Sequence, residues 1–129
     1  MSFWYLATPY AHPSDLVREA RAEAAGRIVA HYLLRGLPVF SPIAHGHAFH
    51  PHLSSWGHND WLEYDRHFLE VSCGLMVAEL PGWVESKGMA WEIEWAEQHK
   101  HPVVHLVEGL LASFLPSRLL EGCAKPECD

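Results

Sequence analysis

This sequence has few basic residues: nine Lys and Arg stand against 16 Asp and Glu, which gives a formal net charge of −7 with histidine neutral. Because no basic patch is present to neutralise phosphates, non-specific binding to nucleic acid is not expected. A small anionic ligand is still compatible with this charge, because backbone N–H groups at a helix N-terminus can bind one. The composition therefore predicts no nucleic-acid partner and is compatible with a small-molecule one.

Cysteine and long apolar runs are also scarce. Cys73 lies in an apolar stretch and Cys123 and Cys128 lie near the C-terminus, an odd number without the spacing of a disulfide framework. Reduced thiols and a cytoplasmic location are therefore expected. No apolar run approaches the roughly 20 residues that a membrane-spanning helix needs, and the first residues lack the pattern of a signal peptide. We expect a soluble protein with no membrane partner.

Aromatic and imidazole side chains are abundant, with six Trp and eleven His in 129 residues. Rings of this kind suit stacking on a ring-shaped ligand as well as packing in a core. The length predicts one domain, residues 1–129, in which about 120–129 form a loose tail.

Short apolar runs alternate with segments of helical periodicity along the chain. Strands are predicted over 3–7, 37–41, 74–80 and 103–107, and helices over 14–35, 60–71, 86–100 and 110–120. This alternation predicts an α/β fold: a flavodoxin-like or Rossmann-like parallel sheet of four to five strands flanked by helices. Ligands of such sheets bind at the carboxyl ends of the strands. Tyr5, Ser41, the His-rich loop 43–58 and Glu92 should therefore surround one crevice.

The corner between the strand 74–80 and the helix after it is the most informative segment. Ser86 is placed to cap that helix, and Gly88 lies four residues before Glu92, so the two share a helix face. Helical side chains lean toward the N-terminus, so Glu92 points back over the patch that Gly88 leaves bare. A carboxylate in this position can act as a nucleophile or hold a ligand. The alternative is a solvated glutamate on a helix surface.

Residues 43–57 show no clear periodicity and are predicted to form a long functional loop. The histidines of this region, His45, His47, His50, His52 and His58, raise the alternative of a metal-dependent hydrolase. Their spacing is irregular, whereas four-coordinate sites usually show tight spacing on ordered elements, so no metal is predicted.

Four pieces of the chain, in this order, resemble the nucleoside 2-deoxyribosyltransferase superfamily, especially its 2'-deoxynucleoside 5'-phosphate N-hydrolase branch and a related bacterial group without assigned function. The pieces are Tyr5-Leu6-Ala7-Thr8-Pro9-Tyr10, the Gly36…Ser41-Pro42 strand, Asp65-x-x-x-Leu69 leading into Val77-Ala78-Glu79-Leu80, and Ser86-x-Gly88-x-x-x-Glu92-x-x-x-Ala96. They span about residues 5–107. Each piece alone is weak, and their common register carries the resemblance.

The resemblance implies cleavage of the N-glycosidic bond of a 2'-deoxynucleoside or its 5'-monophosphate, by hydrolysis or base transfer, without a cofactor and in a homo-oligomer. It assigns catalytic roles to three residues: Glu92 as nucleophile, Asp65 as the acid at the leaving base and Tyr5 as the donor that orients the nucleophile. The predicted substrate-binding residues are Ser86, which matches a phosphate-binding serine, with Gly88, Thr8, Pro9, Tyr10, Ser41 and Asp60, the last also an alternative acid.

The chain departs from the hydrolase branch at Thr8-Pro9, where those enzymes carry Gly-Ser, and at Glu94, where they carry glycine. Asp65 has an alternative interpretation as a surface acid paired with Arg66 or His67. A non-catalytic nucleotide sensor on the same scaffold is the alternative function, because a sensor needs Ser86 and Gly88 but not Glu92.

Overall fold

Four parallel strands form the central sheet of the computed structural model, which describes residues 2–107. The strands are β1 (Trp4–Ala7), β2 (Val39–Phe40), β3 (Gly74–Ala78) and β4 (Val103–Leu106). They lie in the order β2-β1-β3-β4, and each neighbouring pair is parallel. The predicted α/β class with a parallel sheet of four strands is confirmed.

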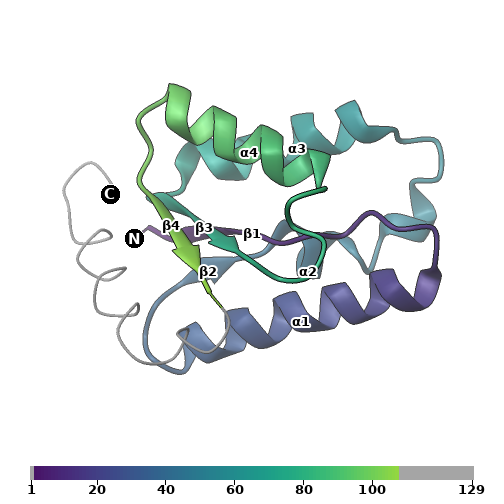
Figure 1. Ribbon diagram of the computed structural model, residues 1–129, viewed down its shortest axis with the longest axis horizontal. Helices are drawn as coiled ribbons and strands as arrows, with labels where there is room; N and C mark the ends of the chain where they lie inside the picture. The colour runs from purple at the N-terminus through teal and green to yellow at the C-terminus, as the bar shows by residue number, and fades with distance from the viewer. Residues whose placement is uncertain (1, 108–129) are drawn as a thin grey trace.

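Helices cover both faces of this sheet. α1 (Asp15–Leu33) lies on one face, and α3 (His58–Val71) and α4 (Lys87–Gln98) lie on the other (Figure 1). Between β2 and α3 the chain forms the short helix α2 (Pro42–Gly46) and a 3₁₀ turn over His50–His52. Every residue of β1 and β3 is buried, as expected for strands covered on both faces.

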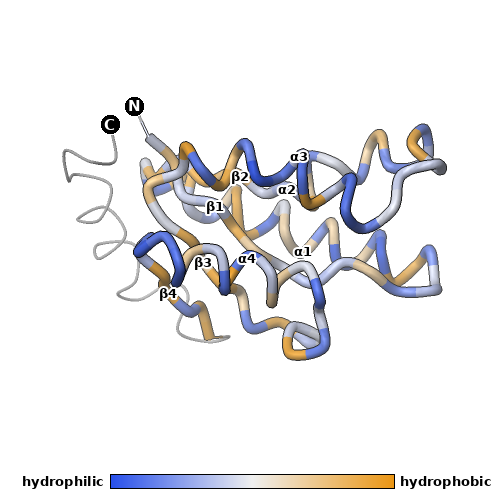
Figure 2. The backbone as a smooth tube through the Cα atoms, turned by 90° about the horizontal axis from the view of Figure 1, so that it is seen from above, coloured by the Kyte–Doolittle hydropathy of each residue, from blue (hydrophilic) through white to orange (hydrophobic). Residues whose placement is uncertain are grey.

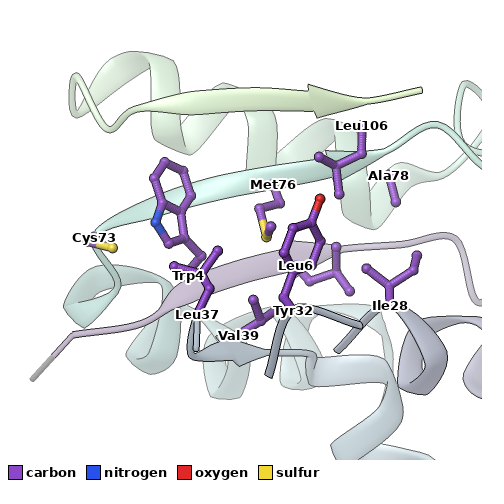
Figure 3. Close-up of a cluster of buried hydrophobic side chains, with 10 residues drawn as sticks. All are labelled: Trp4, Leu6, Ile28, Tyr32, Leu37, Val39, Cys73, Met76, Ala78 and Leu106. Atoms are coloured by element: carbon purple, nitrogen blue, oxygen red, sulfur yellow. The ribbon is translucent and has the colours of Figure 1, made fainter. Parts of the chain in front are cut away.

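The layer between α1 and the sheet is a core of large apolar side chains. Hydrophobic and hydrophilic segments alternate along α1 (Figure 2), and its buried residues Ala22, Ala25, Ile28 and Tyr32 recur at the spacing of one helix face. The strands meet them with large side chains, among which Trp4, Leu6 and Met76 lie together with Tyr32 (Figure 3). This core anchors α1, whose first turns lie at the edge of the sheet where the strands end.

The second core fills the space between the sheet and the α3–α4 layer. It contains alternate residues of β1 and β3 together with Leu69 of α3 and Met89 and Ala96 of α4. Tyr5 belongs to this second layer, because side chains alternate between the faces of a strand. Its ring therefore points toward α4.

The strand order creates a crevice between β1 and β3. From β1 the chain passes through α1 to β2 on one side, and β3 pairs with β1 on the other side. Loops leaving the carboxyl ends of β1 and β3 therefore diverge to opposite faces, which is the position where open α/β sheets bind ligands. The β1–α1 loop and the β3–α4 loop border this crevice.

The segment 43–57, predicted as one irregular loop, is partly helical. Ser41 caps α2 by accepting a hydrogen bond from the backbone N–H of Ala44 at 3.0 Å, and Pro42 occupies the first turn. A serine followed by proline is a helix-start signal, and its closeness to the strand hid it in the sequence. The strand before it is also shorter than predicted, with only Val39 and Phe40 paired.

The predicted helix over 110–120 and the tail with Cys123 and Cys128 lie outside the described residues. Cys73 is buried in the first core. Among residues 2–107, no helix combines the length and the apolar composition that crossing a membrane requires.

Candidate active site

A buried tyrosine–glutamate pair lies where β1 faces α4. The hydroxyl of Tyr5 donates a hydrogen bond to Oε2 of Glu92. Tyr5 is fully buried and Glu92 is 6% exposed, so both polar groups have been removed from bulk water. A buried carboxylate is stable only when hydrogen-bond partners such as this hydroxyl compensate for the lost water. Glu92 is also on a helix face that lines a cleft, and burial in such a place is unusual for a purely structural glutamate. The contact brings two of the predicted catalytic residues together.

Burial changes the ionisation of this pair. It raises the pKa of Glu92 to about 8, while the Tyr5 hydrogen bond lowers that pKa and the nearby Asp65 carboxylate raises it. The pKa of Tyr5 is well above its ordinary value, because of burial first and then the charges of Glu92 and Asp65. Tyr5 is therefore a permanent hydrogen-bond donor, whereas Glu92 changes charge near neutral pH.

Asp65 lies on α3, which packs against α4, and is the third member of this group. It interacts electrostatically with both Tyr5 and Glu92. Desolvation raises its pKa to about 7, so it holds a proton in neutral solution about half of the time. Arg66, its neighbour in sequence, pairs instead with Glu63 and Glu70 on the exposed side of the helix. The interpretation of Asp65 as a surface acid paired with Arg66 is therefore wrong.

Glu92 forms part of the wall of a cleft of about 970 Å³ at the carboxyl edge of the sheet. The β1–α1 loop and α1 line one side of the cleft, through residues that include Thr8, Tyr10 and Arg21. The β3–α4 loop and the first turn of α4 line another side. The volume is ample for a nucleotide-sized ligand, for which sites of 300–1,000 Å³ are typical.

The corner before α4 has the predicted geometry. Oγ of Ser86 accepts a hydrogen bond from the N–H of Met89 at 3.2 Å, so Ser86 caps α4. Gly88 and Glu92, one helical turn apart, both line the cleft. A Cβ atom built on Gly88 would meet only Oγ of Ser86, at 4.0 Å, so the space beside the helix is open. The N–H groups of Lys87 and Gly88 have no acceptor within the helix, and N–H groups in this position can bind an anion.

An aromatic wall closes the cleft on the side of α3. Trp56 and Trp61 line it together with His50, and the Trp61 ring stacks on His50 at a centroid distance of 5.6 Å. Trp56 meets Trp61 edge to face at 5.0 Å. Such a wall favours a flat heteroaromatic ligand group.

The other predicted substrate-binding residues are distributed between the cleft and the scaffold. Thr8 and Tyr10 line the cleft, and the Tyr10 hydroxyl hydrogen-bonds Nδ1 of His47 at 2.8 Å. Pro9 is buried and does not line the cleft. Ser41 caps α2, and the exposed Asp60 accepts a hydrogen bond from the N–H of Gly57 at 2.8 Å. Pro9, Ser41 and Asp60 therefore lie outside the cleft, in positions that support the scaffold.

The histidines of the 43–58 segment mostly pack against aromatic side chains. His45 hydrogen-bonds the hydroxyl of Tyr64 at 3.1 Å, and His47 and His50 both contact the ring of Tyr10. Within the described part of the chain, no group of three or more His, Cys, Asp or Glu side chains is arranged to hold a metal ion. The metal-dependent alternative therefore finds no ligand set among these residues.

Sequence reasoning missed the aromatic wall and one cation of the cleft. Trp56 and Trp61 lie within the segment predicted as loop and helix, where their spacing gave no common face. Arg21 lies on α1, and no sequence pattern singles it out. Its reach to the β3–α4 loop depends on the packing of α1, which no local pattern reveals.

A protein-family model described as a domain of unknown function (DUF1937) matches residues 2–108. A search of the curated proteins found no match. The matched segment includes the sheet, the cleft and the Tyr5–Glu92–Asp65 group.

Proposed function

The chain belongs to the DUF1937 family, and from the chemistry of its cleft we propose that it cleaves the N-glycosidic bond of a 2'-deoxynucleoside or its 5'-monophosphate. Glu92 acts as the nucleophile, Asp65 as the acid and Tyr5 as the group that orients Glu92. The restriction to deoxyribose comes from the resemblance to the nucleoside 2-deoxyribosyltransferase superfamily. The rest of the proposal can be argued from the site.

The observation that carries the proposal is a buried carboxylate, held by a tyrosine, that borders an open cleft. Holding the ionised Glu92 carboxylate away from water costs free energy. Among residues 2–107, no cationic side chain forms an ion pair with Glu92 that would offset this cost. A structural role would be met by a neutral side chain of the same shape. A reaction that develops positive charge at the anomeric carbon would use a negative charge at this place.

In the first half of the reaction, an oxygen of ionised Glu92 attacks the anomeric carbon. The carbon–nitrogen bond breaks, and its electron pair goes to the base nitrogen as the base receives the Asp65 proton. The product of this step is an ester between Glu92 and the sugar. The Tyr5 hydrogen bond holds the attacking oxygen in place and favours the ionised form of Glu92.

In the second half, water or a second base attacks the same carbon from the face that the first base left. The now ionised Asp65 accepts a proton from the attacking group, and the ester bond breaks to return the Glu92 carboxylate. Two displacements give net retention at the anomeric carbon. Whether water or a base attacks decides between hydrolase and transferase.

The aromatic wall supports a nucleoside as the ligand. Trp56 and Trp61 offer ring surfaces on the α3 side of the cleft, where a purine or pyrimidine can stack. Trp83 and Trp91, two other tryptophans, pack against the core between the sheet and α4. Neither lines the cleft.

The proposal is tested by chromatographic detection of free base released from a panel of deoxynucleosides and their 5'-monophosphates, with and without an acceptor base. Glu92→Gln should abolish release, while Glu97→Gln, an exposed glutamate on the same helix, should leave it unchanged. Release that survives Glu92→Gln would contradict the nucleophile assignment. Binding without release throughout the panel would favour the non-catalytic sensor.

A further inference from the structure

Two loops border the cleft at the carboxyl edge of the sheet, and one arginine joins them. The β1–α1 loop, residues 8–14, and the β3–α4 loop, residues 79–86, both contribute residues that line the cleft. Within residues 2–107, no backbone hydrogen bond and no ion pair runs directly from one loop to the other. Surface loops that lack such bonds open at a low free-energy cost. Their separation therefore depends on a contact through a third element.

Arg21 spans the gap between these loops from its place on α1. Its Nη1 donates a hydrogen bond to the carbonyl oxygen of Ala11, in the first loop, at 2.9 Å. Its Nη2 lies beside Gly82, in the second loop, at 2.5 Å from the position that a Cβ atom would occupy there. Ala11, Arg21 and Gly82 all line the cleft. The guanidinium group therefore reaches from one loop to the other at the cleft wall.

The other arginines of α1 have different partners. Arg18 pairs with Asp15 and Arg27 pairs with Glu23, each within the helix. In the part of the chain that the structure describes, no carboxylate forms an ion pair with Arg21. The planar fork of its guanidinium group suits a bridging position, because two of its nitrogens can serve two different partners. Arg21 is therefore distinct from the surface arginines of the same helix.

Gly82 leaves the room that the guanidinium group occupies. The N–H of Trp83 donates to the carbonyl oxygen of Leu80 at 3.0 Å, which closes a β-turn with Pro81 and Gly82 at its centre. Gly82 has a φ of +94°, and a turn in which proline precedes such a residue favours glycine. Any larger residue would also place its Cβ atom against Arg21. Glycine is thus required here twice, by the backbone of the turn and by the arginine beside it.

We propose that Arg21 is a positioning residue, which ties Ala11 of the β1–α1 loop to Gly82 of the β3–α4 loop and so holds the two walls of the cleft in register. These three residues form what we call the arginine strap. One wall carries Tyr10, and the other leads into the first turn of α4 and to Glu92. A ligand that binds between walls already in place loses less conformational freedom and binds more tightly. The strap stands on the geometry alone, whereas its effect on base release rests on the proposed function.

Hydrogen–deuterium exchange of the whole chain tests the strap without any substrate. In Arg21→Ala, the backbone N–H groups of both loops should exchange faster by roughly tenfold, because losing the strap makes local opening easier. Peptides from β1 and β3 should not change. Arg27→Ala is the matched control, because Arg27 is an exposed arginine of α1 that pairs with Glu23. Unchanged exchange in both loops of Arg21→Ala, or faster exchange in one loop alone, would overturn the strap.

A double-mutant cycle isolates the contact between the arginine and the turn. Gly82→Ala strains the backbone with or without Arg21, but it displaces the guanidinium group only when Arg21 is present. Each single change should therefore raise KM for base release, and Arg21→Ala should add less than about twofold when Gly82→Ala is already present. Arg21→Lys keeps the positive charge without the fork, so it should behave like Arg21→Ala. Additive effects, or a wild-type KM in Arg21→Lys, would overturn the strap.

The split between KM and kcat separates positioning from catalysis. Arg21→Ala should raise KM roughly tenfold and leave kcat within about twofold of wild type, because a bound ligand orders the walls again. A fall in kcat at an unchanged KM, or a wild-type KM in Arg21→Ala, would overturn this role and leave the proposed function standing. Faster exchange in both loops of Arg21→Ala, with no base released by wild type from any substrate, would support the strap and overturn the proposed function.

Discussion

Replacing Glu92 by Gln should abolish turnover and yet stabilise the protein at alkaline pH. The folded protein keeps a proton on Glu92 up to about pH 8, whereas an unfolded chain releases it near the ordinary value of 4.5. Between these two pH values the folded state binds more protons than the unfolded state. The free energy of unfolding of wild type must therefore fall as pH rises from about 4.5 to 8.

The size of this effect follows from the difference between the two pKa values. One pKa unit corresponds to about 1.4 kcal/mol, so ionising Glu92 should cost the wild-type fold roughly 3 kcal/mol between pH 5 and pH 8. Gln carries no charge and can still accept the Tyr5 hydrogen bond through its amide oxygen. Glu92→Gln should therefore match wild type at pH 5 and exceed it by roughly 2–4 kcal/mol at pH 8.

The assay is urea or thermal unfolding of both proteins at pH 5, 6, 7 and 8. The difference in unfolding midpoint should grow with pH and reach on the order of 10 °C at pH 8. Glu97→Gln is the control and should show no such trend, because Glu97 is exposed. If the difference in unfolding midpoint between wild type and Glu92→Gln did not change from pH 5 to pH 8, this would refute the reasoning that ionising Glu92 destabilises the folded protein.

Three further predictions concern the chemistry of the site. Wild-type kcat/KM should follow a narrow bell with its maximum between pH 7 and 8, because Asp65 must be protonated and Glu92 ionised. Since the required acid has the lower pKa of the two, the descending limb reports Glu92, and Tyr5→Phe should lower the maximum and move that limb to higher pH because the Tyr5 hydrogen bond lowers the Glu92 pKa. An unmoved descending limb would argue against that bond. Asp65→Asn should lower kcat for base release most strongly for bases that leave poorly, as measured across a substrate series. An equal fall in kcat for every base would show that Asp65 does not protonate the leaving base. Gly88→Ala should stabilise α4 by up to about 1 kcal/mol in thermal unfolding, because alanine favours a helix more than glycine does. The same change should raise KM, because the added methyl group enters the cleft. An unchanged KM would place the ligand elsewhere.

Much of the fold follows from local patterns in the sequence. The apolar runs at 74–78 and 103–106 became buried central and edge strands, and Ser86 caps α4 where a serine precedes a helical pattern. Helix α2 escaped detection because a five-residue helix has no room to show a period. Its start signal, Ser41-Pro42, was instead interpreted as the end of the preceding strand.

The site was only partly accessible from the sequence. The shared face of Gly88 and Glu92 follows from helix geometry alone, and both residues line the cleft. Contacts between elements far apart in the sequence do not follow from local patterns. The link between Tyr5 and Glu92, for example, comes from the family resemblance alone. Arg21 illustrates the limit, because its position beside Gly82 depends on how α1 packs on the sheet.

Asp60 shows the opposite error. Its place near the expected mouth of the crevice suggests an alternative acid, but its carboxylate caps the N-terminus of α3. Acidic residues three positions into a helix commonly have this role, so the local signal was present. Burial is the property that separates Asp65 from Asp60, and burial depends on the tertiary fold.

The covalent ester on Glu92 is the central claim, and mass spectrometry of the acid-quenched reaction tests it most directly. With a deoxynucleoside 5'-monophosphate that releases its base, the account predicts a peptide containing Glu92 that carries the mass of the bound sugar phosphate. The adduct should be absent from Glu92→Gln. Base release at an undiminished rate in Glu92→Gln, with no sugar on any peptide, would contradict the account.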